Sequence, residues 1–358
     1  MRVYYQLGEY VSHAQAGRAN MAALAGAGHE LVDDPAKAHV AVIHDEPPFL
    51  PGHLERLRRE GLPAGTPVAA YCVFEAAPLP EAFAAPLQLA DEVWTCSEFS
   101  RDIFAPRVQN VHVIPHAVER TEPAEADLAR VAALLGHRDD TYWFYTIADA
   151  ANRRKNLLAA LRAFAGLRAE LHPGQGSGQS PDQPRGPDFG SVRVGFVVKQ
   201  YRHSLDLSHL PGVLSLEGEF TDGEIAALHR LCRCYVSPHR AEAWGLGLSE
   251  ALAEGNRVIA TGWSGNMTFM DERNSRPLPF RIVPVTETDL AALPPYFQAG
   301  MLWAEPDLAA LQREMRRALR GTDPDMRLRA QAVTKRFSPA RVGRMMTARL
   351  RALRPDRD

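Results

Sequence analysis

Two glutamates, Glu242 and Glu250, stand eight positions apart around a glycine-rich turn. A carboxylate that accepts hydrogen bonds from two vicinal hydroxyls gains roughly 1.5–3 kcal/mol from each bond. Such a pair could hold two polyols, or the two ends of one ligand. The structural alternative is that Glu242 caps the following helix and that Glu250 is a solvated surface residue.

The elements around this pair predict where it lies. A β-prone run at 235–236 ends at a proline, which places Glu242 in a loop. Helix formers follow from Leu248 to Glu254, with Gly255 at the C-terminal cap. The run Arg257–Thr261 predicts a second strand. In such a parallel α/β unit, ligands bind at the carboxyl ends of the strands, where we expect both carboxylates.

A cluster of cations precedes another predicted helix. Arg153, Arg154 and Lys155 follow a predicted strand, 142–147, and the helix begins at Asn156. Cations at the positive end of a helix dipole are unfavourable unless an anion is bound. Their position therefore indicates an anionic ligand.

The passage around the glutamates resembles a known protein family. It is similar to the Glu-x7-Glu motif of the retaining glycosyltransferases of family 4, which have the two-domain GT-B fold. The segments 260–270, 274–275, 283–285 and 303–307 strengthen the resemblance, which extends from about residue 70 to the C-terminus. The chain departs from the family at Ala148-Asp149, where Gly-Arg is usual. No residue at this position therefore matches the family's usual arginine contact with the donor.

The resemblance implies a donor site for a nucleoside-diphosphate sugar. Lys155 matches the lysine that contacts the diphosphate, and Arg154 would assist it, whereas Arg153 is as well suited to solvent. Glu242 would lie by the sugar hydroxyls, and Glu250 would accept from the ribose hydroxyls. Groups of the glycine turn and of the next strand end would line the same crevice: Trp244, Gly245, Leu246, Gly247, Ser264, Gly265 and Asn266. For the last three residues, a plain β-turn is the alternative.

The predicted first domain would supply the acceptor side. Glu75 ends a strand in the place of an aromatic-Glu phrase of the family, so it is a candidate contact of the acceptor or the reacting sugar, and we count it with Glu242 and Lys155 as catalytic. Glu46 follows an earlier strand, with a plain acidic turn as the alternative. The predicted loop Gly8–Gly17, with His13, would face the cleft. His116 is expected to serve the interdomain hinge and not as a base.

The composition is ordinary for a soluble protein of two domains. The chain has 358 residues, of which 46% are hydrophobic and 23% charged, and its formal net charge of −2 gives no reason to expect nucleic acid. The four cysteines include no CxxC pair, which favours free thiols in a reducing cytoplasm. We expect a cytoplasmic protein. The basic, amphipathic last helix leaves contact with the inner face of the membrane open.

Alternating strand-like and helical segments predict an α/β fold of βαβ units with mainly parallel sheets. The resemblance implies that this fold is of GT-B type, with two Rossmann-like domains that face each other across a cleft. Residues 1–118 would form the acceptor-side domain and residues 119–335 the donor domain. The last helix, within 336–358, would cross back to the first domain. We also expect a helix from Gly17 to Gly28 and a loop without chemistry between Pro173 and Gly190.

The resemblance implies a retaining glycosyltransferase that acts in polysaccharide biosynthesis without metal or cofactor. It would move a hexosyl unit, mannose or glucose, from a UDP or GDP sugar to a glycan or lipid-linked acceptor. Fixed positive charge would stabilise the departing diphosphate, and domain closure would expel water. The alternatives are a nucleotide-sugar-binding scaffold without turnover and another GT-B enzyme, such as an epimerase or an inverting transferase. The oligomeric state stays open.

Overall fold

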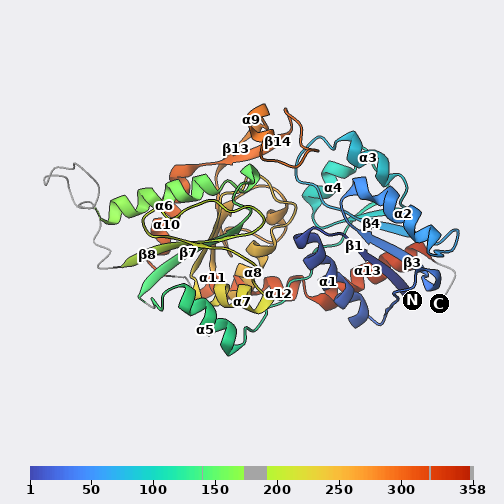
Figure 1. Ribbon diagram of the computed structural model, residues 1–358, viewed down its shortest axis with the longest axis horizontal. Coiled ribbons are helices and arrows are strands. Elements are labelled where there is room, and N and C mark those ends of the chain that lie inside the picture. The colour runs from blue at the N-terminus through green and yellow to red at the C-terminus, as the bar shows by residue number, and fades with distance from the viewer. Residues whose placement is uncertain (139, 173–191, 322–323, 355–358) are drawn as a thin grey trace.

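A computed structural model of the chain describes residues 1–138, 140–172, 192–321 and 324–354. The predicted loop between Pro173 and Gly190 lies outside these ranges. The described residues form two α/β lobes, each built on a six-stranded sheet (Figure 1). The fold class predicted from the sequence is therefore confirmed.

The first lobe is a parallel sheet in the order β2-β1-β3-β4-β5-β6. Its strands are β1 (Arg2–Leu7), β2 (Glu30–Leu31), β3 (Val40–His44), β4 (Val68–Tyr71), β5 (Glu92–Thr95) and β6 (Val111–Val113). Its helices are α1 (Val11–Gly26), α2 (Leu50–Arg59), α3 (Glu81–Leu87) and α4 (Glu98–Phe104). All residues of β3 and β4 are buried, as a parallel sheet covered on both faces requires.

The second lobe repeats this plan with a parallel sheet in the order β12-β11-β10-β7-β8-β9. Its strands are β7 (Thr141–Ala148), β8 (Arg193–Gln200), β9 (Val213–Leu216), β10 (Cys234–Ser237), β11 (Arg257–Thr261) and β12 (Arg276–Leu278). Its helices are α5 (Glu125–Leu134), α6 (Leu157–Leu171), α7 (Asp222–Leu231), α8 (Leu246–Glu254), α10 (Leu308–Ala318), α11 (Pro324–Gln331) and α12 (Val333–Arg336). Both sheets turn the carboxyl ends of their central strands toward the other lobe (Figure 1).

Helix α1 begins earlier than the sequence predicts. It starts at Val11, so most of the expected loop Gly8–Gly17 is helical and His13 lies in the first turn. Gly17 lies inside the helix, and its lack of a side chain allows Leu7 to pack against its backbone. A Cβ at Gly17 would lie only 2.2 Å from a methyl carbon of Leu7. A glycine required for close packing was thus mistaken for the start of the helix.

Residues 280–306, which we call the arm, join the second lobe to the first. The arm contains the antiparallel pair β13 (Phe280–Pro284) and β14 (Leu302–Pro306), with α9 (Glu287–Leu290) between them. The N–H of Leu302 donates to the carbonyl oxygen of Ala77 in the first lobe, at 3.0 Å. Phe297 is buried in a hydrophobic cluster of the first lobe, where its ring lies 5.5 Å from that of Phe74. The arm spans the two lobes at the top of Figure 1.

The last helix, α13 (Pro339–Leu353), returns to the first lobe and packs on α1. Its apolar side, with Val342, Met346 and Leu350, is buried. Gly343 allows close contact, since a Cβ there would lie 2.4 Å from the carbonyl oxygen of Ala23. Packing on α1 therefore accounts for the amphipathic pattern of this helix.

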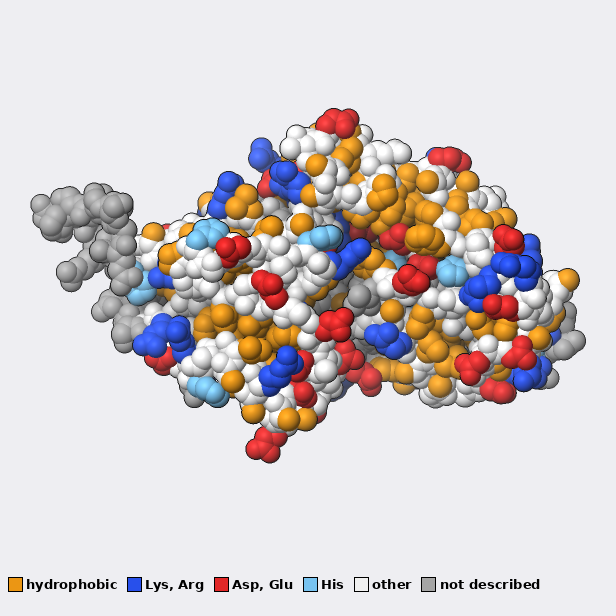
Figure 2. Space-filling view, in the orientation of Figure 1, with side chains coloured by type: hydrophobic (Ala, Val, Ile, Leu, Met, Phe, Trp, Pro, Cys, Tyr) orange, Lys and Arg blue, Asp and Glu red, His pale blue; other side chains and the backbone are white. Residues whose placement is uncertain are grey.

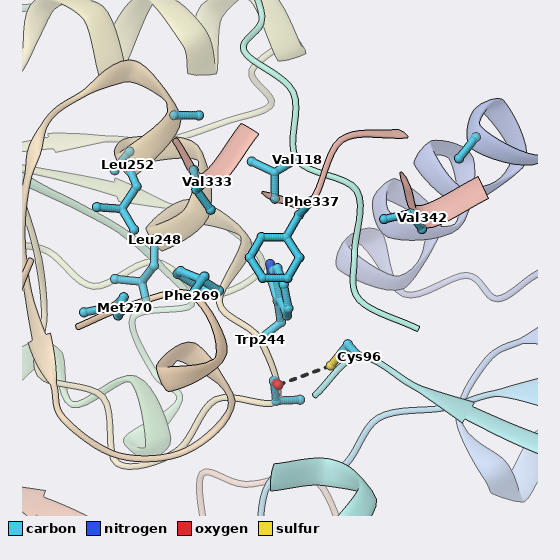
Figure 3. Close-up of a cluster of buried hydrophobic side chains, with 14 of the residues drawn as sticks. Cys96, Val118, Trp244, Leu248, Leu252, Phe269, Met270, Val333, Phe337 and Val342 are labelled. Carbon is cyan, nitrogen blue, oxygen red and sulfur yellow. Dashed lines mark hydrogen bonds between the residues drawn. The ribbon is translucent and has the colours of Figure 1, made fainter. Parts of the chain in front are cut away.

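Buried side chains from both lobes form one hydrophobic cluster between them. Figure 3 shows Trp244 at its centre, with Phe269 and Phe337 beside it. The Cys96 thiol and the Ser97 hydroxyl of the first lobe both donate to the carbonyl oxygen of Ala243, at 3.2 and 2.8 Å. The lobes thus share an apolar core beside the predicted site.

Candidate functional site

Buried charges link the two lobes at the carboxyl ends of their strands. The Lys155 ammonium donates to Oε1 of Glu242 at 2.5 Å, and Nη1 of Arg154 lies 3.1 Å from Oε2 of the same carboxylate. On its other side, Nε of Arg154 lies 2.9 Å from Oε1 of Glu75 in the first lobe. All four side chains are at most 16% exposed. The three predicted catalytic residues therefore belong to one network, which Arg154 completes.

The local chain geometry explains how the two cations reach this position. Asn152 caps a short 3-10 turn, Arg153–Lys155, by accepting from the N–H of Arg154 at 3.0 Å. Asn156 then adopts a left-handed conformation, φ 53°, and α6 starts in a new direction at Leu157. The cations therefore lie on a bend that precedes the helix.

The carboxylates compensate the cation cluster within the chain itself. Arg154 and Lys155 are paired as described above, and Arg153 pairs with Asp289 of the arm at 3.0 Å. The sequence argument assumed that these cations lack partners and therefore need an external anion. That assumption is wrong, because Glu242 and Glu75 reach the cluster from distant segments.

Electrostatics fixes the ionisation of this network. Burial alone would raise the pKa of Glu242, but the charges of Lys155 and Arg154 outweigh it and hold that pKa at about 2. Burial would likewise lower the pKa of Lys155, and the Glu242 charge raises it instead. Both groups are therefore ionised at neutral pH. Their charges are fixed before any ligand arrives, which favours electrostatic stabilisation in a site that excludes water.

Glu250 lies on α8 and also faces the first lobe. Its Oε1 accepts from the side-chain amide of Gln15 on α1 at 3.0 Å, and Nε2 of His229 lies 3.4 Å from Oε2. Burial raises the pKa of Tyr235, and the charges of Glu242 and Glu250 raise it further. The two carboxylates thus have a common neighbour. The capping role considered for Glu242 is not observed, since α8 has no side-chain cap.

The glycine turn leaves backbone donors free at the start of α8. Gly245 caps the helix in a left-handed conformation, φ 93°, and its carbonyl accepts from the N–H groups of Leu248 and Ser249. Among the described residues, the N–H groups of Leu246 and Gly247 have no partner. Free amides at a helix N-terminus favour anions. Trp244 itself is buried in the interlobe core.

The predicted Ser264-Gly265-Asn266 turn packs directly behind Glu242. The Ser264 hydroxyl accepts from the N–H of Glu242 at 2.9 Å. Gly265 donates its N–H to the Glu242 carbonyl oxygen at 2.8 Å, and a Cβ at Gly265 would lie 1.7 Å from the carbonyl oxygen of Ala243. Asn266 is fully buried, and its Oδ1 lies within hydrogen-bond distance of Nε2 of His239, at 3.1 Å. These residues hold the Glu242 loop in place.

The acceptor-side candidates gather at the carboxyl ends of β1 and β3. Gly8 packs closely against Asp45, since a Cβ added at Gly8 would lie 2.2 Å from Oδ1 of Asp45. Glu46 accepts from the Tyr296 hydroxyl at 2.5 Å, so the arm of the second lobe reaches this edge. Burial raises the pKa of Glu46, which the Tyr296 hydrogen bond opposes. Charged side chains lie on both sides of the line where the lobes meet (Figure 2).

The buried His44 and His116 and the partly buried His13 form a cluster behind the carboxyl ends of β1 and β3. The ring of His44 lies 6.0 Å from that of His13 and 6.4 Å from that of His116. Burial lowers the pKa of His13 to about 4 and that of His116 to about 3. Nδ1 of His116 lies 3.1 Å from the Tyr71 hydroxyl, and its ring contacts Trp244 at 5.6 Å. His116 therefore lies at the junction of the lobes, and its role in an interdomain hinge stays a prediction.

Two neighbouring residues of the site were missed in the sequence. Tyr201 and Arg202 directly follow β8, at the same sheet edge. Burial raises the pKa of Tyr201, while the positive charge of Lys155 opposes the rise. Arg202 lies over the ring of Tyr10 in the first lobe, 4.6 Å from its centroid. The rule that ligands meet the carboxyl ends of parallel strands could have identified both.

At the departure from the family pattern, Asp149 has a partner of its own. It is 4% exposed, and its Oδ1 lies 3.1 Å from Nδ1 of His203. Within the described ranges, no group of three or more His, Cys, Asp or Glu side chains could hold a metal ion. In those same ranges, no helix has the length and apolar character needed to cross a membrane.

The comparisons with known proteins reveal likeness in structure only. The chain matches no protein-family model, and no relative among the curated proteins matches it. A glycosyltransferase from Rickettsia africae ESF-5 has a TM-score of 0.66 at 11% identity, over 99% of both chains. Anabaena HepE in complex with UDP and glucose has a TM-score of 0.64 at 12% identity, over 98% of both chains. Sucrose-phosphate synthase from Thermosynechococcus elongatus has 0.62 at 14%, over 98% of both.

This likeness covers both lobes and their relative placement. Two facing parallel sheets, with a last helix that returns to the first lobe, are the GT-B arrangement expected from the sequence. In that fold the site described above lies at the carboxyl ends of the strands, between the lobes, where ligands of open α/β sheets bind.

Proposed function

We propose that the chain is a glycosyltransferase that moves a hexosyl unit, mannose or glucose, from a nucleoside-diphosphate sugar to a glycan or lipid-linked acceptor. One observation carries the proposal. Lys155, Arg154 and Glu242 are fixed together between the lobes, beside free N–H groups at the start of α8 and the carboxylate of Glu250. Cations, helix amides and carboxylates are the groups that a diphosphate and sugar hydroxyls require.

The residues divide the donor between them. Lys155, Arg154 and the amides of Leu246 and Gly247 would hold the diphosphate, Glu242 the sugar hydroxyls, and Glu250 the ribose. UDP is the favoured nucleotide because the Anabaena HepE structures contain UDP and UDP-glucose. Glu46, Glu75 and His13 would line the acceptor side.

We further propose that transfer retains the anomeric configuration and needs no metal. The bond between C1 of the sugar and the β-phosphate oxygen breaks as the acceptor oxygen bonds to C1. The acceptor proton passes to that departing phosphate oxygen, so no protein base is required. Fixed charge on Lys155 and Arg154 stabilises the leaving diphosphate. The family 4 motif supports retention, which front-side attack on the same face of the sugar achieves.

The test is release of nucleoside diphosphate from UDP-glucose, UDP-galactose, GDP-mannose and GDP-glucose, with and without a panel of glycan acceptors and in the presence of EDTA. We expect one donor to be turned over in EDTA, with an α-configured product by NMR. Tight UDP binding without any turnover would favour a nucleotide-sugar-binding scaffold. Neither binding nor turnover with any nucleotide would refute the proposal, and an inverted product would refute retention.

A further inference from the structure

A polar cavity lies in the second lobe, away from the interlobe site. Its volume is about 460 Å³, and it is lined by residues at the ends of α5, α7 and α8. It also touches Thr141, the first residue of β7, and Arg233 and Asn256, which directly precede β10 and β11. The cavity therefore faces the amino ends of the strands, whereas the proposed donor site faces the carboxyl ends.

Arginines dominate the lining of this cavity, namely Arg138, Arg230, Arg233 and Arg327. Among the described lining residues, the one carboxylate belongs to Glu254, and it is already paired with Arg230 and with Arg120, which lies outside the lining. Among the described residues, the side chains of Arg138, Arg233 and Arg327 make no ion pair or hydrogen bond. The cavity thus has an excess of positive charge that the described residues do not compensate.

Helix dipoles explain only one of these arginines. Arg230 occupies the last turn of α7, where a cation is favourable. The ends of α5 and α8 are capped by their own backbone, because Gly136 and Gly255 adopt left-handed conformations and the next N–H groups bond back to Ala132 and Ala251. Arg327 lies in the first turn of α11, where the dipole disfavours a cation. The remaining arginines are therefore not needed as caps.

We propose that this cavity binds a small phosphate monoester. Guanidinium groups bind phosphate oxygens bidentately, and three arginines without a partner among the described residues line this cavity. The volume lies within the range of small-molecule sites and leaves room for a polar group attached to the phosphate. Thr141 and Asn256 supply neutral polar groups on the same wall.

A chain of side-chain contacts joins this cavity to the interlobe site, and its first two links are hydrogen bonds. The side-chain amide of Asn256 donates to the Tyr145 hydroxyl at 2.7 Å, and that hydroxyl lies 2.6 Å from Nδ1 of His229. Nε2 of His229 in turn lies 3.4 Å from Glu250. If Glu250 binds ribose as proposed, a ligand at Asn256 is connected to the nucleotide through three side chains.

The proposal is tested by calorimetric titration of the full chain with glucose 6-phosphate, inorganic phosphate and, as an uncharged control, glucose. The test variant is Arg138→Ala/Arg233→Ala, which removes two arginines that have no partner in the described structure. Arg313→Ala is the matched control, because Arg313 is also exposed and makes no ion pair in the described residues. Lys155→Ala serves to detect phosphate binding in the interlobe site.

We expect wild type, Arg313→Ala and Lys155→Ala to bind glucose 6-phosphate alike and more tightly than inorganic phosphate, with at least tenfold weaker binding by the double variant. Binding lost only in Lys155→Ala would place the phosphate between the lobes and overturn the proposal. No binding by wild type, equal binding by the double variant, or equal affinity for inorganic phosphate would overturn it too. No measurement depends on sugar transfer, so this test can fail or succeed independently of the proposed function.

Discussion

Glu242 and Glu250 come from one loop and helix, yet their surroundings are opposite. The Glu242 side chain is 10% exposed and lies between two cations. The Glu250 side chain is 27% exposed and is held by an amide of the other lobe and an imidazole. The Glu242 carboxylate is a fixed part of the buried ion-pair network between the lobes. The Glu250 carboxylate accepts a hydrogen bond from Gln15, which ligand hydroxyls can replace.

This difference separates stability from binding. Removing one partner of a buried ion pair leaves an unpaired buried charge, at a cost of about 3–5 kcal/mol. The Glu250 carboxylate is more exposed, and its removal leaves no buried cation unpaired among the described residues. Its loss should therefore cost little folding free energy. Mutations at the two positions should therefore affect different measurements, and each of the following predictions tests that division.

Glu242→Gln should have the largest effect. It removes the proposed contact of the donor sugar and leaves Lys155 and Arg154 without their shared carboxylate. We expect kcat/KM to fall at least about 100-fold and unfolding in urea to show a loss of about 3 kcal/mol. Unchanged stability would mean that the ion pairs contribute nothing in solution, and the contrast with Glu250 would disappear.

Lys155→Ala should lower kcat at least about tenfold, equivalent to about 1.4 kcal/mol of transition-state stabilisation. Arg154 still neutralises Glu242 in this variant, so the fold should remain intact by circular dichroism. Lys37→Ala is the control, since Lys37 is exposed and lies in the first lobe. Wild-type kinetics in Lys155→Ala would remove this residue from the diphosphate site.

Lowering the pH should remove the contribution of ionised Glu242 to the free energy of unfolding. The folded pKa of about 2 is below the ordinary 4.5, so the unfolded chain takes up this proton first as the pH falls. The stabilisation from Glu242 is therefore complete above about pH 4.5 and is lost between that pH and about 2. Urea unfolding across this window should show a shallower pH dependence in Glu242→Gln than in wild type. Identical slopes would contradict the assigned pKa.

Glu250→Ala should weaken UDP binding about tenfold, because the ribose loses a charged acceptor. Its free energy of unfolding should stay within about 0.5 kcal/mol of wild type. Calorimetry with UDP provides the measurement, and Glu219→Ala supplies a matched control at an exposed carboxylate of the same lobe. An unaltered dissociation constant would count against the ribose role.

Gln15→Ala should produce the smallest change, in the opposite direction. Its amide occupies Glu250 in the ligand-free chain, so UDP has to displace it. Without that competitor, UDP should bind about threefold more tightly. Weaker binding would indicate that Gln15 contacts the nucleotide instead.

The sequence predicts local elements well where their start and end signals are adjacent. The strand Arg257–Thr261 has the expected bounds, the helix Pro339–Leu353 lies within the expected range 336–358, and Gly255 ends α8 in a left-handed conformation. Each depends on a regular pattern of apolar residues followed by a glycine, a proline or a turn. The start of α1 was wrong because Gly17 carries a packing role that only the folded chain reveals.

Contacts between distant segments were beyond the reach of sequence patterns. The motif placed Glu242 and Lys155 in one crevice, and the structure pairs them. The motif did not indicate that Gln15 would bond to Glu250, or that Tyr296 would reach Glu46. Both pairs join residues more than two hundred positions apart, so only the tertiary fold determines them.

The arm limits which segments of such a chain can be exchanged between homologues. Phe297 and Trp303 complete the apolar core of the first lobe, although the chain reaches them only after most of the second lobe. The acceptor edge is consequently encoded in two separate stretches of the gene. Recombination that exchanged only the amino-terminal half between two homologues would import Glu46 without its Tyr296, and a working hybrid would have to inherit residues 280–306 from the same parent.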